Sequence, residues 1–364
     1  MVQGQGGRYI QTGGILQYFE DLNYTPNAEI GPKGFFEIAS NRAARLRKIP
    51  GLTDIHTGEI YLQTDKKWPQ TVTLTDVGLR DGIQIEARLI PTAMKLELID
   101  ALVGAGLKHL QITAFVHPEK VPQMADAEEL VRRLQPYDGV EFSGLVLNPA
   151  GVIRAREAGL HSVEVSVSAS DTHSRKNAGI SLARAKEMAV EMVVCAKEAG
   201  LQVRAGIQCA FWCVYEGGVP VSRIVEMAGA YVRAGADTLA LSDTTGMGTP
   251  VAVAALLGAV DVTVGDTPLA LHLHDTRGLG MVNLMQALEA GITRFDTSFG
   301  GMGGCPFVKG AAGNIATEDT VYLLSSLGIA TGIDIHGVST CSAKMEKFLE
   351  KPLPGKLYRF YPTL

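Results

Sequence analysis

Residues 269–275 read L-A-L-H-L-H-D, a short apolar run in which His272 and His274 stand two positions apart. Side chains two apart on a β-strand point to the same face, so this run predicts a strand that presents both imidazoles together. Seven similar β-rich runs occur elsewhere in the chain, at 71–77, 109–115, 140–146, 162–168, 202–208, 238–244 and 294–300. The stretches between them have the apolar spacing of amphipathic helices, among them 93–105, 183–199 and 220–234.

This alternation predicts an α/β protein of the (β/α)8 TIM-barrel class with an N-terminal extension. A doubly wound open sheet is the alternative, but it usually stops at about five or six strands and often has a G-x-G-x-x-G turn after the first. Here the first run is followed by G-L-R-D-G (78–82). We therefore expect an extension over 1–70 that packs on the barrel or on a partner subunit. A catalytic barrel over 71–335 and a C-terminal helix and tail over 336–364 would follow.

The composition excludes several classes of protein. The 364 residues are 46% hydrophobic, which is enough for a sizeable core, and the net charge of −5 argues against a nucleic-acid partner or a membrane-surface role. No apolar run approaches about 18 residues, so no membrane span is expected. The five cysteines include no C-x-x-C pair, which favours a reducing compartment. Together with an N-terminus that has no apolar signal segment, this predicts a cytoplasmic protein, which we expect to be a homo-oligomer.

Polar side chains follow the predicted strands at the end where a (β/α)8 barrel has its active site. Singly, each has an ordinary explanation: an Arg-Asp pair can be a surface ion pair, and an aspartate after a strand can be a helix N-cap. Their shared position at one end of the strands favours a single site instead. The residues are Arg80, Asp81, Gln111, Asp243, His272, His274, Cys305 and Asn314.

Four of these residues could bind a metal ion. His272 and His274 supply two nitrogens, and Asp81 supplies a carboxylate from the first strand, which neighbours the eighth in a closed barrel. A loop amide such as Asn314 could add another oxygen. Two nitrogens with hard oxygens suit Mg²⁺ or Mn²⁺ better than a thiolate zinc site. Such an ion would act as a Lewis acid, and Arg80 could stabilise an enolate oxygen.

Six segments of the chain resemble the 3-hydroxy-3-methylglutaryl-CoA lyase family, metal-dependent barrel lyases related to isopropylmalate synthase. The most specific is G-G-M-G-G-C-P-F-V-K-G-A-A-G-N-I-A-T-E-D (300–319), because the lyases, unlike the synthases, have a cysteine-bearing glycine loop of this form. The others are G-L-R-D-G-I-Q (78–84), F-V-H-P-E-K-V-P-Q-M (115–124), S-A-S-D-T-H-S-R-K-N (168–177), S-D-T-T-G-M-G-T-P (242–250) and H-L-H-D-T (272–276).

The resemblance implies a lyase that cleaves a 3-hydroxyacyl-CoA thioester to acetyl-CoA and a keto acid by retro-Claisen or retro-aldol chemistry. Asp81, His272, His274 and Asn314 would bind the divalent cation, and Arg80 would stabilise the acetyl-CoA enolate. Cys305 would take part in proton transfer, and Asp243 would lie near the substrate. The residues implied near the CoA-binding mouth are Ser168, Arg175, Lys176 and Asn177.

The chain departs from this family's pattern near the substrate. Gln111 stands where the lyases have a glutamate, and Ile85 stands where they have an asparagine. Both 3-hydroxy-3-methylglutaryl-CoA and a relative such as citramalyl-CoA therefore stay open as substrates. The alternatives are a Claisen-type condensing enzyme, which would be expected to lack the Cys305 loop, a CoA-independent aldolase, or a non-catalytic barrel, which Gln111 would favour.

Overall fold

The computed structural model describes residues 52–53, 61–62, 68–304 and 313–361. The chain divides into two compact units, Met1–Lys67 and Trp68–Leu364. In the first unit the described residues form a short antiparallel pair, β1 (Leu52–Thr53) with β2 (Tyr61–Leu62). The prediction that the extension packs on the barrel or on a partner subunit concerns residues outside the described part of the chain.

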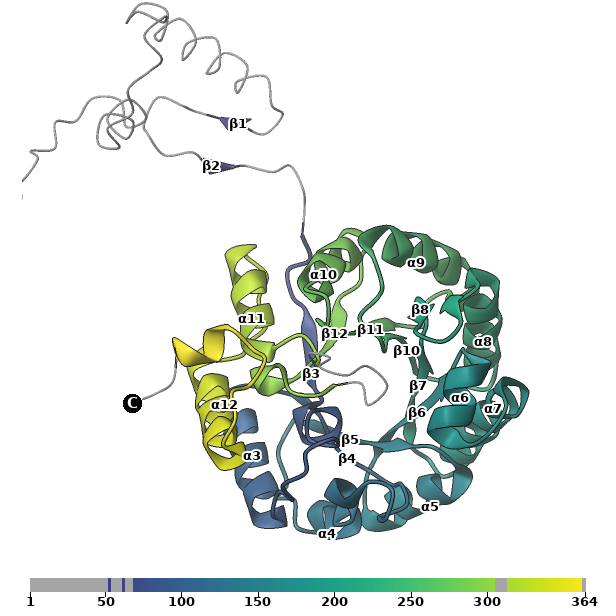
Figure 1. Ribbon diagram of the computed structural model, residues 1–364, viewed down its shortest axis with the longest axis horizontal. Helices are drawn as coiled ribbons and strands as arrows, with labels where there is room; N and C mark the ends of the chain where they lie inside the picture. The colour runs from purple at the N-terminus through teal and green to yellow at the C-terminus, as the bar shows by residue number, and fades with distance from the viewer. Residues whose placement is uncertain (1–51, 54–60, 63–67, 305–312, 362–364) are drawn as a thin grey trace, which may run out of the picture. The chain divides into compact units, whose positions relative to one another are not determined.

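The second unit is a closed barrel of eight parallel strands, in the order β10-β11-β12-β3-β4-β5-β6-β7 (Figure 1). Each strand lies within one of the eight predicted runs, so the (β/α)8 prediction is confirmed. The strands are β3 (Thr73–Asp76), β4 (His109–Ala114), β5 (Glu141–Val146), β6 (Ser162–Ser168), β7 (Gln202–Gln208), β10 (Thr238–Asp243), β11 (Leu269–Leu273) and β12 (Arg294–Thr297).

Helices surround the barrel (Figure 1). On α8 the buried residues Ile224, Met227, Ala228 and Tyr231 recur at helical spacing, which gives one apolar face against the strands. The helices are α3 (Thr92–Gly104), α4 (Ala127–Arg132), α5 (Pro149–Ala158), α6 (Asp171–Ala178), α7 (Leu182–Glu198), α8 (Val221–Arg233), α9 (Pro250–Val264), α10 (Gly280–Glu289), α11 (Thr317–Ser326) and α12 (Ile335–Leu349). Short helical turns are η2 (Gly78–Gly82), η3 (Pro122–Met124), η4 (Phe299–Gly301) and η5 (Leu357–Arg359), and β8 (Trp212–Cys213) pairs with β9 (Gly217–Gly218).

Within the described ranges, no helix combines the length and apolar character that crossing a membrane requires.

The barrel interior is polar on the side of β6. All seven residues of this strand are buried, and serine or glutamate occupies every second position. Because side chains alternate along a strand, Glu164 and Ser166 point inwards while Val163 and Val165 point towards the helices. Glu164 contacts Gln111 of β4, which is separated from β6 by β5, so this contact crosses the interior.

Two buried carboxylates hold the turn that follows β12. Glu318 accepts hydrogen bonds from the Gly300 backbone N–H and the Ser342 hydroxyl. Asp76 accepts from the Phe299 backbone N–H at 2.8 Å and from the Thr317 hydroxyl at 2.7 Å. Burial raises the pKa of Glu318 to about 7 and that of Asp76 to about 6. Both carboxyls therefore bind protons more tightly in the folded protein than in the unfolded chain.

We expect Glu318→Gln to flatten the pH dependence of stability. The stability from protonating Glu318 is fully present below its ordinary pKa of 4.5 and is lost as pH rises to about 7. Over that window the loss amounts to about 3 kcal/mol. Urea unfolding of wild type and variant at several pH values measures this difference. Glu350→Gln, at an exposed carboxylate on the surface, is the control. Equal pH slopes in wild type and Glu318→Gln would contradict the expectation.

Candidate active site

Three of the residues predicted as metal ligands converge at the C-terminal end of the strands. Asp81, His272 and His274 are buried, and one ligand atom from each lies within 4.8 Å of the other two. The two Nε2 atoms are 3.0 Å apart, and Asp81 Oδ2 lies 3.9 Å from that of His272 and 3.7 Å from that of His274. His272 lies on β11 and His274 directly follows this strand, while Asp81 lies in η2, shortly after β3. Two imidazole nitrogens and a carboxylate oxygen directed at one point form a possible metal site.

Asn314, the fourth predicted ligand, lies against this cluster. Its Nδ2 donates to Asp81 Oδ2 at 2.9 Å and to the Met302 carbonyl at 3.0 Å. Its Oδ1 is buried and has no hydrogen-bond partner among the described residues. A buried acceptor without a partner is unfavourable, and a cation beside it would remove that cost. The donor set therefore fits a divalent metal ion.

The ring of His272 is oriented by residues behind it. Its Nδ1 lies 2.9 Å from Asp296 Oδ2, and Arg204 donates to both oxygens of Asp296, at 2.7 and 2.6 Å. Burial favours the neutral form of Asp296, but Arg204 and His272 outweigh it and lower the pKa of this carboxyl. An ionised Asp296 accepts the Nδ1–H of His272, so His272 Nε2 presents its lone pair to the cluster.

Arg80 lies beside the cluster and is 6% exposed. Its guanidinium pairs with Asp81 Oδ1, and its Nε donates to Gln111 Oε1. Burial alone would raise the pKa of the Asp81 carboxyl, but the charge of Arg80 and contacts with His274 and His272 lower it well below its ordinary range. Asp81 is thus held as a carboxylate, the form in which it binds cations.

A cavity of about 370 Å³ opens over the cluster. Arg80, Asp81 and both histidines contribute to its wall, and Ile85, which is 45% exposed, stands at its rim. The remaining wall is mixed, with the apolar residues Ala114, Val116, Val121, Leu145 and Leu147 beside a polar set. The polar set includes Gln84, Lys120, Glu164, Ser166, His173, Asn177, Gln208, Ser242 and Thr244.

The residues implied near the CoA-binding mouth have different positions. Asn177 lines the cavity. Arg175 forms an ion pair with Asp171 at 2.8 Å, and Lys176 Nζ lies 5.0 Å from the centre of the Tyr215 ring. The Ser168 hydroxyl accepts from the backbone N–H of Ser170 at 3.1 Å.

Asp243 has local partners. Its two carboxylate oxygens accept from the backbone N–H groups of Met247 and Gly248, each at 3.0 Å, so it supports the loop after β10. Burial raises the pKa of its carboxyl. The neighbouring Ser242 and Thr244 line the cavity. Cys305 lies outside the described residues, and its role stays a prediction.

Two glycines that flank residues 305–312 in the chain lie close to the candidate metal ligands. Gly303 has φ 121°, and a Cβ there would lie 2.6 Å from Asn314 Nδ2 and 3.3 Å from Asp81 Oδ2. A Cβ at Gly313 would lie 2.6 Å from the backbone nitrogen of Gly303. Any side chain at either position would therefore displace the backbone or the ligand set.

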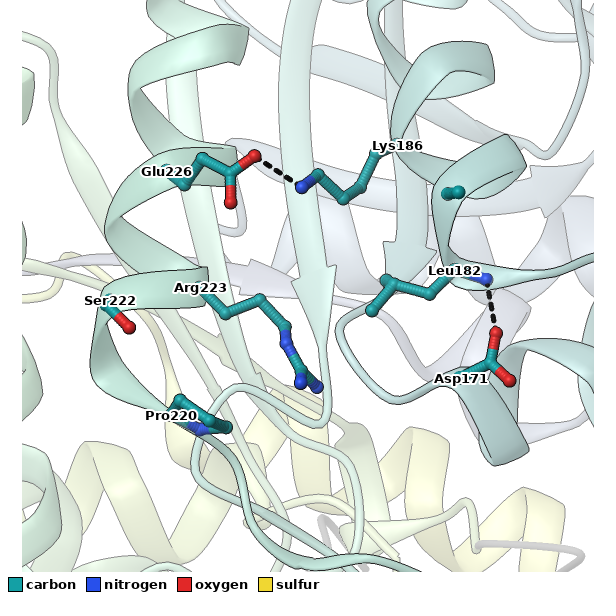
Figure 2. Close-up of a pocket in the computed structure, with 8 residues that line it drawn as sticks. Asp171, Leu182, Lys186, Pro220, Ser222, Arg223 and Glu226 are labelled. Carbon is teal, nitrogen blue, oxygen red and sulfur yellow. Dashed lines mark hydrogen bonds and ion pairs between the residues drawn. The ribbon is translucent and has the colours of Figure 1, made fainter.

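A second cavity, of about 500 Å³, lies among the helices and is shown in Figure 2. Lys186 of α7 reaches across to Glu226 of α8, and the Asp171 carboxylate accepts from the backbone N–H of Leu182 at 2.8 Å. These charged groups already pair with other residues of the protein. The cavity over the histidines is therefore the better candidate for the active site.

Sequence reasoning missed three charged residues that support the site: Glu164, Arg204 and Asp296. All three lie in runs that were recognised as strands. A polar residue at every second position in such a run was the available signal, because it marks the side of the strand that faces the interior.

Comparisons with known proteins relate the chain to one family. The family model described as HMGL-like matches residues 71–344. The mitochondrial hydroxymethylglutaryl-CoA lyase of Mus musculus is 38% identical over 299 residues, which are 82% of this chain and 91% of that protein. The crystal structure of Bacillus subtilis HMG-CoA lyase superposes with a TM-score of 0.79 at 36% identity and covers 81% of this chain and 99% of its own. An HMG-CoA lyase from Acinetobacter baumannii, in complex with coenzyme A and 3-methylmalate, has a TM-score of 0.77 at 32% identity and covers 82% and 97%.

Proposed function

Because this chain belongs to the HMGL-like family, we propose that it is a divalent-metal-dependent carbon–carbon lyase. Its substrate would be a 3-hydroxyacyl-CoA thioester, either 3-hydroxy-3-methylglutaryl-CoA or a relative such as citramalyl-CoA. The observation that carries the proposal is the convergence of Asp81, His272 and His274 beside Arg80 in one cavity at the C-terminal end of the strands. A condensing enzyme, a CoA-independent aldolase and a non-catalytic barrel are the alternatives that the experiment below separates.

In this proposal Asp81, His272, His274 and Asn314 hold the cation, for which Mg²⁺ or Mn²⁺ is the best match to nitrogen and oxygen donors. When bound, the cation acts as a Lewis acid towards the oxygen atoms of the substrate. Asp296 keeps His272 in the tautomer that binds metal. The buried carboxylate of Asp81 also holds Arg80 at the cavity wall through their ion pair.

The reaction begins when the hydroxyl of the substrate loses its proton to a base. The carbon–carbon bond then breaks, its electron pair passes to the thioester carbonyl, and the alkoxide carbon becomes the carbonyl carbon of the keto acid. Arg80, a fixed donor in the cavity wall, stabilises the negative charge that develops on the thioester oxygen. Protonation at carbon, for which Cys305 is the proposed donor, yields acetyl-CoA.

The acyl-CoA partner is supported by the family and by the position of α6 after β6, at the active-site end of the barrel. Asn177, on α6, lines the cavity. We propose that the CoA moiety approaches from this side, near Ser168, Arg175 and Lys176.

A cytoplasmic location and a homo-oligomeric state stay predictions. Deleting residues 2–65 and measuring both mass and activity would test whether the extension covers an interface or the barrel.

The experiment that tests the function is a cleavage assay with the purified full-length protein and Mn²⁺ or Mg²⁺. The substrates are 3-hydroxy-3-methylglutaryl-CoA, citramalyl-CoA and a longer-chain homologue, with acetyl-CoA and keto acid measured as products. We expect one thioester to be cleaved at least about tenfold more efficiently than the others, because a buried polar contact discriminates on this scale or more. Chelation should stop the reaction and added Mn²⁺ should restore it.

Each alternative gives a different result in this assay. Net consumption of acetyl-CoA and keto acid would indicate a condensing enzyme, and cleavage of hydroxy acids without CoA would indicate an aldolase. Metal binding without turnover of any of these substrates would favour a non-catalytic barrel. Fast and selective cleavage of 3-hydroxy-3-methylglutaryl-CoA would rule out an altered substrate.

A further inference from the structure

We propose that Glu164 is a positioning residue of this site, whose carboxylate fixes the Gln111 amide and, through it, the Arg80 guanidinium. The inference rests on the proposed function, in which Arg80 meets the charge that develops on the thioester. It assigns a role to a residue that belongs to none of the motifs of the sequence. It also explains how the chain works with a neutral side chain at position 111.

Hydrogen bonds are donated in one direction, from Arg80 to Gln111 and from Gln111 to Glu164. Gln111 Nε2 donates to Glu164 Oε2 at 2.8 Å, and Gln111 Oε1 accepts from Arg80 Nε. All three side chains are buried, with exposures of 5%, 1% and 6% for Glu164, Gln111 and Arg80. Water therefore does not substitute readily for any of these partners, and each contact matters for the next.

The chemistry of the three groups allows only one orientation of the amide. A guanidinium only donates hydrogen bonds, and a carboxylate only accepts them. A flipped Gln111 would place its NH₂ group against the Arg80 N–H and its oxygen against the Glu164 carboxylate, and both contacts would be repulsive. Arg80 and Glu164 together determine which end of Gln111 faces Arg80, and Glu164 holds the amide in the place from which it contacts the guanidinium.

Glu164 also faces the residues that orient His272. Its Oε2 lies 3.4 Å from Arg204 Nε, and Arg204 in turn holds Asp296 with two hydrogen bonds. Because β7 and β12 are separated by β10 and β11, the Arg204–Asp296 pair crosses the barrel interior. The Glu164 carboxylate is therefore the link between the group of residues that holds Arg80 and the group that holds His272.

The barrel provides space for this carboxylate. Glu164 contributes to the cavity wall, and Gly206, which pairs with Ser166 on the neighbouring strand β7, lies near its carboxylate. A Cβ at Gly206 would lie 2.8 Å from Glu164 Oε1 and 2.9 Å from Ser166 Oγ. A side chain on β7 at this position would force the carboxylate aside, so the glycine and the glutamate fit together.

The negative charge near Gln111 comes from a different strand in this chain than the family resemblance implies. The resemblance puts a glutamate at position 111, whereas here an amide occupies that position and the carboxylate stands on β6, one hydrogen bond away. If Glu164 replaces that charge, moving it back to position 111 should preserve function. Two carboxylates at these positions together should instead repel each other.

Three variants test this exchange: Glu164→Gln, Gln111→Glu and the double variant Gln111→Glu/Glu164→Gln. The matched control is Glu141→Gln, at the start of β5, where the carboxylate pairs with His109 at the opposite end of the barrel. Readouts are kcat and KM for the thioester cleaved by the wild type, Mn²⁺ affinity by calorimetry, and the thermal midpoint. The Arg80 Nε–H resonance in ¹⁵N-arginine-labelled protein, assigned with Arg80→Lys, reports directly on the guanidinium.

We expect Glu164→Gln to lower kcat about 10- to 100-fold while KM and Mn²⁺ affinity change by less than about threefold, a range typical of residues that orient a functional group. The Arg80 resonance should shift or broaden in this variant and stay unchanged in Glu141→Gln. Gln111→Glu alone should lower the thermal midpoint, on the order of 5 °C, by placing two carboxylates in contact. The double variant should regain most of both kcat and thermal stability.

The proposal is overturned if Glu164→Gln keeps the wild-type kcat and the wild-type Arg80 resonance. It is also overturned if the effects of the two single substitutions on thermal stability simply add in the double variant. These outcomes differ from failure of the proposed function, in which the wild type cleaves no thioester. The resonance and the stability cycle would still decide whether Glu164 positions Arg80 in that case.

Discussion

His274→Ala is expected to lower kcat by about a thousandfold or more and to weaken Mn²⁺ binding by at least about 100-fold, because it removes one of the atoms proposed to bind the ion. The remaining proposed donors, His272, Asp81 and Asn314, would leave the cation with a larger share of water ligands. The fold should persist, since His274 Nδ1 has no hydrogen-bond partner among the described residues. His272 is less suitable for this substitution, because removing it would also leave the buried Asp296 without one of its hydrogen-bond partners.

Calorimetry with Mn²⁺ and an acetyl-CoA release assay measure the two effects separately. The control is His336→Ala, on α12, where the imidazole contacts the Tyr361 carbonyl at the surface. The control should retain both metal affinity and turnover. A His274→Ala protein that binds Mn²⁺ and turns over like the wild type would remove the metal site from the proposed mechanism.

Arg80→Lys is expected to lower kcat by about 100- to 1000-fold with little change in KM, because it removes a preorganised donor at the point where the proposed reaction develops charge. Lysine keeps the positive charge but lacks the planar fork, so it cannot contact both Asp81 and Gln111 as the guanidinium does. The substitution therefore separates geometry from charge.

Steady-state kinetics of this variant are compared with those of Arg88→Lys. Arg88 follows Arg80 closely in the chain but lies at the surface, where it pairs with Glu350 at 2.9 Å. We expect the control to match the wild type. If Arg80→Lys raised KM and left kcat unchanged, Arg80 would bind the substrate without stabilising the transition state.

The sequence predicts the strands and the histidine pair well, because both depend on local spacing. His272 and His274 share a face for the same reason that L-A-L-H-L-H-D forms a strand, and barrel closure brings Asp81 to them. The same spacing marks Glu164 and Asp296 as facing the interior, but it does not identify their partners. Which interior residues meet depends on how far each strand is staggered relative to the others, and the spacing within one strand does not contain that information.

Position at the end of a strand is also an incomplete guide to the site. Asp243 follows β10 as expected, yet its oxygens bind the backbone of the next turn. Arg175 pairs with Asp171 within α6. A charged side chain binds the nearest suitable partner, and for these two residues that partner is local. Gln111, by contrast, contacts side chains that are distant in the chain, Arg80 and Glu164.

The contact between Gly303 and Gly313 has a consequence for loop engineering. The barrel fixes these two positions side by side against Asp81 and Asn314. A longer loop grafted between residues 304 and 313 would join two ends that already lie side by side, and each doubling of its length would add only about 0.6 kcal/mol to the cost of closing it. Natural variants at either glycine should be interpreted as disturbing the candidate metal ligands, although neither residue has a side chain to bind metal.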